Sequence, residues 1–262
     1  MQHRARKRFG QNFLRDPHII DRMVRAIAPA PGQNIVEIGP GLAALTLPLL
    51  EKAHRMQAVE LDRDLVPELI ERCRDVGEMT IHQGDALRFD FRALRSDERR
   101  LRVVGNLPYN ISTPLIFHLL EAAADIEDMH FTLQKEVVDR LAAGPGEDAY
   151  DRLSVMVQYY CAVTSLFPIA PGSFTPVPKV DSAFVRLVPH PTPPYPVDDV
   201  GLLSRLVAQA FGQRRKTLRN SLKGMLGEAA IVAAGIEPNI RPEQVPLSGF
   251  VSLARQVDRS AH

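Results

Sequence analysis

Tryptophan is absent from this sequence, cysteine occurs only twice, and no apolar run approaches the roughly 20 residues of a membrane-spanning helix. Cys73 and Cys161 are far apart and show no metal-ligand or redox spacing, so we expect neither a metal nor a disulfide. The basic N-terminal segment is not followed by the apolar stretch of a signal peptide. These absences predict a cytoplasmic protein that has no metal site and no association with membranes.

A charge excess of either sign is also missing, because 32 Lys and Arg face 31 Asp and Glu, for a formal net charge of +1. The distribution is uneven, however. Residues 1–15 hold five Lys or Arg and no acidic residue, and residues 201–262 hold nine against four. Basic ends around an acidic body fit a protein that grips a polyanion locally, although a solubilising tail and an ordinary helix surface would give the same pattern.

Short apolar runs alternate with helical patterns over the first 190 residues. The runs predict strands near 35–38, 56–61, 79–82, 102–105, 129–133, 162–167 and 182–188. Helices are expected from Pro17, after the N-cap residue Asp16, and near 42–52, 64–73, 114–124, 135–142 and 152–160. This alternation predicts an α/β fold with a parallel, doubly wound, Rossmann-like sheet and helices on both faces.

A proline-rich segment separates this region from the rest of the chain. Residues 189–196 contain five prolines in eight positions, which predicts a stiff, extended linker. Beyond it the pattern is helical only, near 199–211, 215–226, 228–234 and 247–258. We therefore expect an α/β domain over 1–190 and a small all-helical domain over 197–262.

A glycine turn follows the first strand expected in the sheet, in the sequence Val36-Glu37-Ile38-Gly39-Pro40-Gly41. Gly39 and Gly41 allow a tight turn and a close approach of the backbone to a ligand. Ala44 occupies the third position of the dinucleotide-binding pattern, which that pattern accepts. A nicotinamide-dependent enzyme is therefore one candidate.

Three acidic residues favour S-adenosylmethionine instead, because each follows or ends a predicted strand. Glu37 can face a cationic sulfonium or amino group, Glu60 can accept hydrogen bonds from ribose hydroxyls, and Asp85 can accept one from the adenine amine. Any one of these acids alone would be explained equally well as a solvated turn residue. Together with the glycine turn, they predict a methyltransferase cofactor site.

The sequence Asn106-Leu107-Pro108-Tyr109 follows another predicted strand and matches the motif of methyltransferases that act on amino groups. An exocyclic adenine amine is a poor nucleophile, and two acceptors at its hydrogens would return electron density to nitrogen. The Asn106 side-chain oxygen and the Leu107 carbonyl can be these acceptors. Pro108 restricts Leu107 to an extended conformation, and Tyr109 offers a ring for stacking on the base. A plain turn after a strand is the alternative interpretation.

Phe174 lies in a segment rich in proline, Pro171–Lys179. An aromatic ring in a rigid loop can form a second wall for a base, so Phe174 is a further candidate. By itself, a phenylalanine beside prolines is more often part of the core.

Five segments together resemble the ribosomal RNA adenine dimethyltransferase family. They are Arg6–Leu14, Val36–Thr46, Asn106–Ser112, Phe174–Ser182 and Gln213–Leu222, and the resemblance extends from about residue 3 to about residue 258. The last four are most similar to the bacterial enzymes that act on 16S ribosomal RNA. Within this family, no motif position departs from the pattern.

The resemblance implies a monomer that uses S-adenosylmethionine to convert two adjacent adenosines to N6,N6-dimethyladenosine. The target implied is a hairpin loop near the 3′ end of 16S rRNA, within the 30S subunit. The family's cofactor contacts carry over to Asn12, Leu14, Gly39, Glu60, Asp85 and Asn106. Its target-base contacts carry over to Asn106, Leu107, Tyr109 and Phe174. Gln11 and Asn12 would form a lid over the cofactor.

The segment Arg214–Lys223 predicts a basic amphipathic helix, with Arg215, Arg219 and Lys223 on one face and Leu218, Leu222 and Leu226 on another. The basic face would contact phosphates without reading sequence, unless it is simply solvated. The candidate RNA-binding residues are Arg6, Lys7, Arg8, Arg214, Arg215, Lys216, Arg219 and Lys223.

Three other functions remain open at this point. A 23S rRNA adenine methylase of the macrolide-resistance type would share the cofactor and base motifs. DNA or protein-glutamine N-methyltransferases typically have Pro-Pro-Tyr where this chain has Leu-Pro-Tyr. An assembly factor that binds the small subunit, with catalysis secondary, is compatible with the first hypothesis.

Overall fold

The computed structural model describes residues 12–213 and 215–260, and the chain divides into two compact units. The first unit comprises Met1–Val138 and Thr164–Pro189, and the second comprises Asp139–Val163 and His190–His262. The domain limits expected from the linker, 1–190 and 197–262, remain a prediction. Among the described residues, no helix combines the length and the apolar character needed to cross a membrane.

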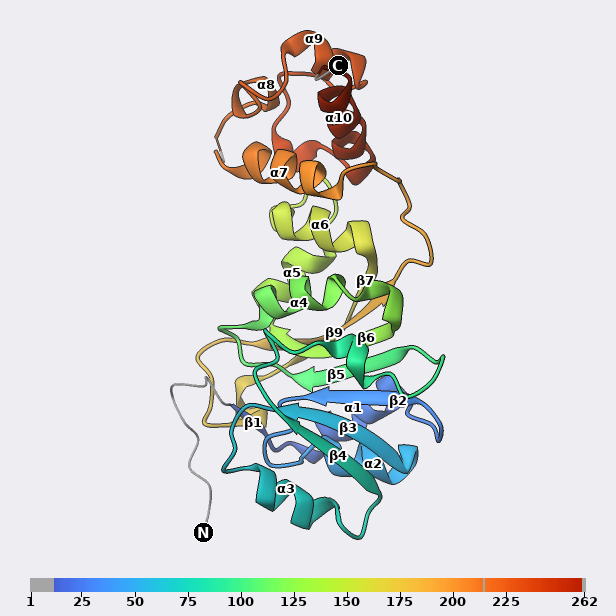
Figure 1. The fold of residues 1–262 in the computed structure, drawn as a ribbon. Helices are drawn as coiled ribbons and strands as arrows, with labels where there is room; N and C mark the ends of the chain where they lie inside the picture. The colour runs from blue at the N-terminus through green and yellow to red at the C-terminus, as the bar shows by residue number, and fades with distance from the viewer. Residues whose placement is uncertain (1–11, 214, 261–262) are drawn as a thin grey trace. The chain divides into compact units, whose positions relative to one another are not determined.

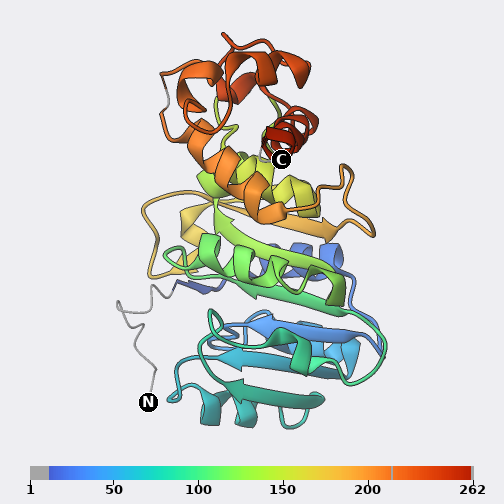
Figure 2. The ribbon, with the colours of Figure 1, turned by 45° about the horizontal axis from the view of Figure 1, so that its top comes forward.

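A seven-stranded sheet with the order β4-β3-β2-β5-β6-β9-β7 forms the framework of the first unit. The strands are β2 (Asn34–Ile38), β3 (Arg55–Glu60), β4 (Glu78–Gln83), β5 (Leu101–Asn106), β6 (Ile126–Gln134), β7 (Cys161–Ile169) and β9 (Ser182–Pro189). The helices of this unit are α1 (Pro17–Ile27), α2 (Thr46–Ala53), α3 (Val66–Cys73) and α4 (Ser112–Leu120), whereas α5 (Lys135–Ala142) and β7 each belong partly to both units. All seven predicted strands are present, and Figures 1 and 2 show helices on both faces of the sheet.

The sheet is not parallel throughout, contrary to the sequence expectation. β9 pairs with β6 in the antiparallel sense, whereas β2, β3, β4, β5 and β6 pair in parallel. Parallel neighbours need a long crossover, usually a helix. Between β7 and β9 there is only the short helix η4 (Pro171–Ser173) and the two-residue strand β8 (Phe174–Thr175), so β9 returns in the opposite direction.

The strand order places a topological switch point between β2 and β5. The chain leaves β2 toward β3 and β4 and then crosses back to β5 on the other side of β2. Gly105 permits the close approach of these two strands, because a Cβ atom there would lie 2.7 Å from the carbonyl oxygen of Ile38. Ligands of open α/β sheets bind at the carboxyl ends of strands at such a point.

Helix α1 begins where the sequence predicts. The Asp16 side chain accepts hydrogen bonds from the backbone N–H groups of His18 and Ile19, and Pro17 occupies the first turn. The apolar face of α1 buries Met23, Val24 and Ile27 in a core cluster shared with β2, α2 and β3. A strong N-cap and an amphipathic pattern therefore explain both the start and the packing of this helix.

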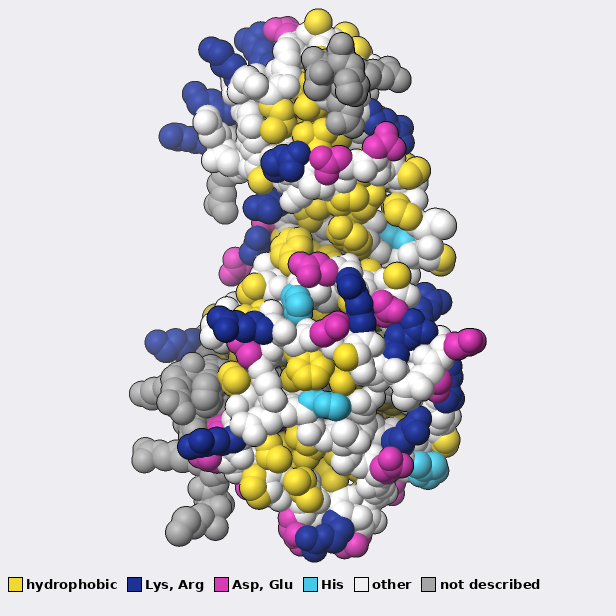
Figure 3. Space-filling view, viewed as in Figure 1, with side chains coloured by type: hydrophobic (Ala, Val, Ile, Leu, Met, Phe, Trp, Pro, Cys, Tyr) yellow, Lys and Arg dark blue, Asp and Glu magenta, His cyan; other side chains and the backbone are white. Residues whose placement is uncertain are grey.

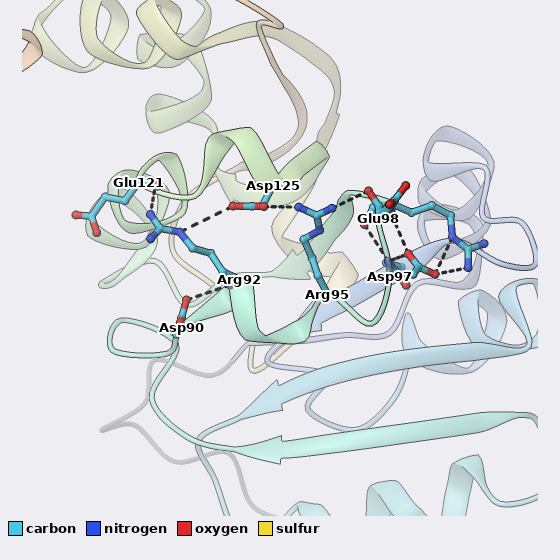
Figure 4. Close-up of polar contacts among 9 residues, drawn as sticks. Asp90, Arg92, Arg95, Asp97, Glu98, Glu121 and Asp125 are labelled. Atoms are coloured by element: carbon cyan, nitrogen blue, oxygen red, sulfur yellow. Dashed lines mark hydrogen bonds and ion pairs between the residues drawn. The ribbon is translucent and has the colours of Figure 1, made fainter.

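Charged side chains connect the segments that precede β5 and β6 (Figure 4). Arg95 lies 2.5 Å from Asp125, and Arg92 donates to the carbonyl oxygen of Glu121 at 2.6 Å. Asp97 accepts from the Asn34 side-chain amide at 2.9 Å. These contacts attach the connection between β4 and β5 to the beginnings of the neighbouring strands, at the edge away from their carboxyl ends.

A buried ion pair lies at the same edge. Arg102 on β5 and Asp128 on β6 form two hydrogen bonds of 3.0 and 2.8 Å, and their side chains are 7% and 3% exposed. Arg102 also donates to the Ile27 carbonyl oxygen and to the Gln33 side chain. The guanidinium thus joins the end of α1 and the start of β2 to two central strands.

The second unit holds α6 (Arg152–Tyr160), which precedes the linker. Beyond the linker, the described residues form helices and no strand: α7 (Val200–Phe211), α8 (Leu218–Ser221), α9 (Glu228–Ala233) and α10 (Leu247–Ser260). Its core includes the buried side chains of Leu203, Leu206, Val207, Phe250 and Leu253. The predicted helices 199–211, 228–234 and 247–258 are confirmed to within a few residues.

The predicted helix 215–226 is wrong, because only Leu218–Ser221 is helical within it. The N–H groups of Leu218 and Arg219 donate to the carbonyl oxygens of Ile240 and Pro238, which starts the helix late. Gly224 has a φ of +91°, which ends any continuation. Arg215, Arg219 and Lys223 are exposed but do not share one helical face, whereas Leu218, Leu222 and Leu226 are buried as expected.

Replacing Asp128 by alanine should leave Arg102 charged and buried without its partner. We expect Asp128→Ala to lower the free energy of unfolding by about 3–5 kcal/mol, as measured by urea denaturation. Asp21→Ala removes an exposed ion pair with Arg25 on α1 and serves as the control, with little change expected. Equal effects of the two substitutions would contradict this account.

Candidate active site

A cavity of about 230 Å³ opens at the carboxyl ends of β2, β3, β4 and β5. The sequence predicted residues that contact the cofactor or the target base. Those that the structure describes all line this cavity, except Phe174. They are Asn12, Leu14, Glu37, Gly39, Gly41, Glu60, Asp85, Asn106, Leu107, Pro108 and Tyr109. Parallel strands end at the same edge of a sheet, so residues remote in sequence converge here.

The glycine turn after β2 forms one wall of the cavity. Gly39 and Gly41 have φ values of +65° and +56°, which residues with a Cβ atom rarely adopt. A Cβ atom at Gly39 would meet no atom within 4 Å, so the turn leaves open space beside the main chain. At Gly41 it would lie 3.1 Å from the ring of Phe13 in β1 (Phe13–Leu14), so β1 packs against this turn. The wall thus fits a ligand that contacts bare backbone.

The three acidic residues differ in how they are held. Glu60 accepts hydrogen bonds from the N–H groups of Asp62 and Gly41, at 2.7 and 3.3 Å. Asp85 accepts one from the N–H group of Leu87 at 3.0 Å. Each carboxylate oxygen has two lone pairs, so both groups retain capacity to accept from a ligand.

Glu37 is the most deeply buried of these acids, with 2% of the residue exposed. Neither its Oε2 atom nor the hydroxyl of Thr46 has a hydrogen-bond partner of good geometry among the described residues. Burial, with a smaller contribution from the neighbouring Glu60 and against the opposing effect of Thr46, raises the pKa of Glu37 from 4.5 to about 7. A buried carboxylate oxygen without a partner fits a ligand that carries a positive charge.

The side chain of Asn106 lies in the cavity wall. The main chain of Asn12, the residue that precedes β1, orients it. Its Nδ2 atom donates to the Asn12 carbonyl oxygen at 2.8 Å. This contact requires the NH₂ group, so it directs Oδ1, the acceptor, away from Asn12. The N–H group of Leu107 donates to the Thr132 carbonyl oxygen at 3.3 Å, which attaches the motif to β6.

Tyr109 is partly buried and is held at both ends. Its hydroxyl lies 2.6 Å from the Ser182 hydroxyl, and its carbonyl oxygen accepts from the Ser112 hydroxyl at 3.1 Å. Burial raises the pKa of Tyr109, so the phenol is neutral at physiological pH. The ring can therefore offer a fixed, uncharged face to a planar ligand.

Phe174 is placed differently from the sequence expectation. It is 1% exposed, pairs through β8 with Leu14 of β1, and belongs to the core cluster that contains Met23 and Phe184. Its ring does not line the cavity as the described residues define it. Core packing, the alternative interpretation of its sequence context, is what this structure shows, and contact with a target base stays a prediction for this residue.

Five proposed site residues lie outside the part of the chain that the structure describes: Arg6, Lys7, Arg8, Gln11 and Arg214. Within the described ranges, no group of three His, Cys, Asp or Glu side chains could hold a metal ion.

Sequence reasoning missed several residues of the cavity. Leu61 and Asp62 follow Glu60, and Ala86 and Leu87 follow Asp85. Their position directly after strands that end in an acid was the available signal. Leu61 is 49% exposed although it is apolar, as expected of a residue that a ligand would cover.

The fold and the site together define a class of protein. A seven-stranded sheet in which β9 is antiparallel to β6, a glycine turn after β2 and acids at the ends of β2, β3 and β4 are features of S-adenosylmethionine-dependent methyltransferases. Residues 2–258 match the family described as ribosomal RNA adenine dimethylase. The chain belongs to this family.

Similar proteins agree with this assignment. The ribosomal RNA small subunit methyltransferase A of Pseudomonas putida is 60% identical over 256 residues, which is 98% of this chain and 96% of that protein. The protein of the same name from Pseudomonas aeruginosa is 58% identical, with the same coverage.

Two solved structures are similar to the whole fold. A dimethyladenosine transferase from Plasmodium falciparum has a TM-score of 0.79 and 25% identity, covering 95% of this chain and 98% of that chain. The 23S rRNA methyltransferase ErmE has a TM-score of 0.75 and 24% identity, covering 94% and 100%, and this likeness concerns the fold alone.

The raised pKa of Glu37 leads to a prediction about pH. A carboxyl with a folded-state pKa of about 7 and an ordinary value of 4.5 stabilises the protein below pH 4.5, and this contribution is lost as pH rises through 7. The difference corresponds to about 3 kcal/mol at most. Glu37→Gln should therefore unfold at higher urea concentration than the wild type at pH 8, with a much smaller difference at pH 5.

The same substitution should weaken S-adenosylmethionine binding about tenfold or more in calorimetry at pH 8, because a cation loses its anionic partner. Wild-type affinity should also fall as pH drops below about 7, and that of Glu37→Gln should change less. If Glu37→Gln were no more stable than the wild type at pH 8, the conclusion that burial raises the pKa of Glu37 would be contradicted.

Proposed function

We propose that this protein uses S-adenosylmethionine to dimethylate N6 of two adjacent adenosines in 16S rRNA. The observation that carries the proposal is the placement of Asn106 on the wall of the cavity that also contains Glu37 and the glycine turn. Family membership and relatives that bear the name of a small-subunit rRNA methyltransferase support the same substrate. The target we propose is the hairpin loop near the 3′ end, within the 30S subunit.

The residues of the cavity fit the cofactor on chemical grounds. Glu37 would face the positively charged methionine portion, Glu60 would accept from the ribose hydroxyls, and Asp85 would accept from the adenine amine. The backbone at Gly39 has open space for a ligand in contact with it. When bound, S-adenosylmethionine supplies a methyl group that its sulfonium has already activated.

Activation of the target amine is the task of Asn106 and Leu107. The Asn106 Oδ1 atom and the Leu107 carbonyl oxygen would accept hydrogen bonds from the amine's two N–H groups and increase electron density on nitrogen. The Asn12 carbonyl holds the Asn106 amide, and Pro108 restricts Leu107, so neither acceptor has to reorganise during the reaction. The alkylated nitrogen is positively charged and acidic, so its proton can pass to water, and no strong base is required of the protein because positioning and electrostatics provide the catalysis.

Tyr109 would stack on the adenine after the base leaves its own stack. Phe174 would contribute a second wall only if its ring left the core, because it is buried in this structure.

The second unit supplies basic residues for RNA. Arg215, Lys216, Arg219 and Lys223 are exposed, and Figure 3 shows Lys and Arg side chains along one side of this unit. They surround a short helix rather than line a long one, and we propose that they contact phosphates. Together with the basic N-terminal residues, they would position the RNA while the cavity selects the base.

The other candidate functions have less support. A 23S rRNA specificity is not favoured, because the relatives with 57–60% identity bear a small-subunit name. Leu107 in place of proline argues against a DNA or protein-glutamine methyltransferase. An assembly role on the small subunit is compatible with catalysis and forms part of our proposal, as do a monomeric state and a cytoplasmic location.

The proposal is tested directly by incubating unmethylated 30S particles with S-adenosylmethionine and this protein. The small-subunit rRNA is then analysed by mass spectrometry. We expect two dimethylated adenosines in one hairpin loop. Methylation of 23S rRNA alone, or of neither RNA, would reject the function.

Asn106→Ala should lower the rate of methyl transfer roughly 100-fold, because it removes one preorganised acceptor from the reacting amine. Binding of 30S particles should change little, because phosphate contacts elsewhere dominate affinity. Asn106→Asp is the companion variant, since it keeps an acceptor oxygen at the Oδ1 position but has no NH₂ group to donate to the Asn12 carbonyl oxygen. Near-normal turnover by Asn106→Ala would contradict its catalytic role.

Arg215→Ala combined with Arg219→Ala should weaken binding to 30S particles and reduce the salt slope of log affinity by roughly one per lost phosphate contact. The control combines Arg25→Ala and Arg55→Ala, two exposed arginines at the edge where the strands of the sheet begin. Filter binding at several salt concentrations provides the measurement. The same slope in both double variants would rule out the proposed phosphate contacts.

A further inference from the structure

The hydroxyl of Ser182, a residue distant in sequence, contacts the side chain of Tyr109 in the segment Asn106–Tyr109, the catalytic motif. Its Oγ atom lies 2.6 Å from the hydroxyl of Tyr109, and the serine is fully buried. Ser182 is the first residue of β9 and pairs with Gln134 of β6, while the preceding carbonyl, of Asp181, accepts from the N–H group of Lys135. The serine is thus fixed by the antiparallel part of the sheet.

Ser182 does not itself line the cavity as the described residues define it, whereas Tyr109 does. Any effect of the serine on a ligand must therefore pass through the tyrosine. The backbone end of Tyr109 is held separately by the Ser112 hydroxyl, at 3.1 Å. Within residues 12–213 and 215–260, Ser182 is the hydrogen-bond partner of the phenol, so without it packing by these residues would limit the rotation of the ring.

We propose that Ser182 is a positioning residue for methyl transfer, because it fixes the plane of the Tyr109 ring against which the target adenine stacks. The inference rests on the proposed function, since it assumes that a base occupies the space beside Tyr109. The plane of the ring sets the plane of the base, and the plane of the base sets where N6 lies relative to Asn106 and Leu107. Small displacements of reacting groups reduce rates strongly, so the serine acts on catalysis more than on cofactor binding.

A mutant cycle tests this role. Ser182→Ala and Tyr109→Phe each remove one partner of the hydrogen bond and keep the ring, and each should lower kcat by about threefold to tenfold. The KM for S-adenosylmethionine should not change. Because both variants remove the same contact, the double variant should be no slower than the slower single variant. Ser182→Thr, which retains the hydroxyl, should restore most of the rate.

Ser173→Ala is the matched control, because Ser173 is also buried in the segment before β9 but its hydroxyl donates to Asp16. It should have the kcat of the wild type. Stacking can be followed separately with a target hairpin that carries 2-aminopurine at the methylated position, since the protein has no tryptophan to interfere. Ser182→Ala should reduce the fluorescence change on binding, and Ser173→Ala should not.

The proposal would be overturned if Ser182→Ala had the kcat of the wild type. It would also be overturned if the reductions in kcat caused by Ser182→Ala and Tyr109→Phe multiplied in the double variant. If Ser182→Ala does not fold, Tyr109→Phe decides, because unchanged kcat in that variant excludes a role for the contact. Failure of the wild type to methylate 30S particles would instead reject the proposed function, so the two failures are distinguishable.

Discussion

The direct pairing of β2 with β5 is the constraint on which the rest of this structure depends. It brings Glu37, near the end of one strand, and the glycine turn that follows it beside Asn106, which ends the other strand, although these residues are far apart in sequence. The pairing is possible at this distance because residue 105 is glycine, and a Cβ atom there would collide with the Ile38 carbonyl. A cofactor-binding wall and a base-binding wall thus form the two sides of one cavity.

The two edges of the central strands have different physical roles. Where the strands begin, Arg102 and Asp128 satisfy each other almost completely, and a partly buried ion pair between Arg95 and Asp125 attaches the connecting segments. Where they end, Glu37 is buried without full hydrogen bonding, and its raised pKa shows the free-energy cost. Paired charges thus lie at one edge and an incompletely paired acid at the edge that forms the cavity, and such local violations are common at functional sites.

Orientation of the catalytic motif comes from segments outside it. The Asn12 carbonyl holds the Asn106 amide, and the position of Asn12 follows from the pairing of β1 with β8. Ser182, at the other end of the connection from β8 to β9, contacts Tyr109. Phe174 anchors the start of this connection in the core. The segment Phe174–Ser182 therefore supports the motif at two points, which gives the segment a role that does not require Phe174 to touch the base.

Local patterns in the sequence determined much of this protein. Apolar runs set all seven strands of the sheet, the Asp16-Pro17 pair set the start of α1, and strand-terminal glycines and acids predicted the cavity residues, because these features depend on near neighbours in the chain. Contacts between distant segments were decided only in the tertiary structure: the antiparallel direction of β9, the burial of Phe174 and the contact between Tyr109 and Ser182. The helix expected over 215–226 failed for the same reason, since carbonyl groups from residues 238 and 240 compete for its first N–H groups. Periodicity records which side chains avoid water, and it carries no information on which remote partner will satisfy a given polar group.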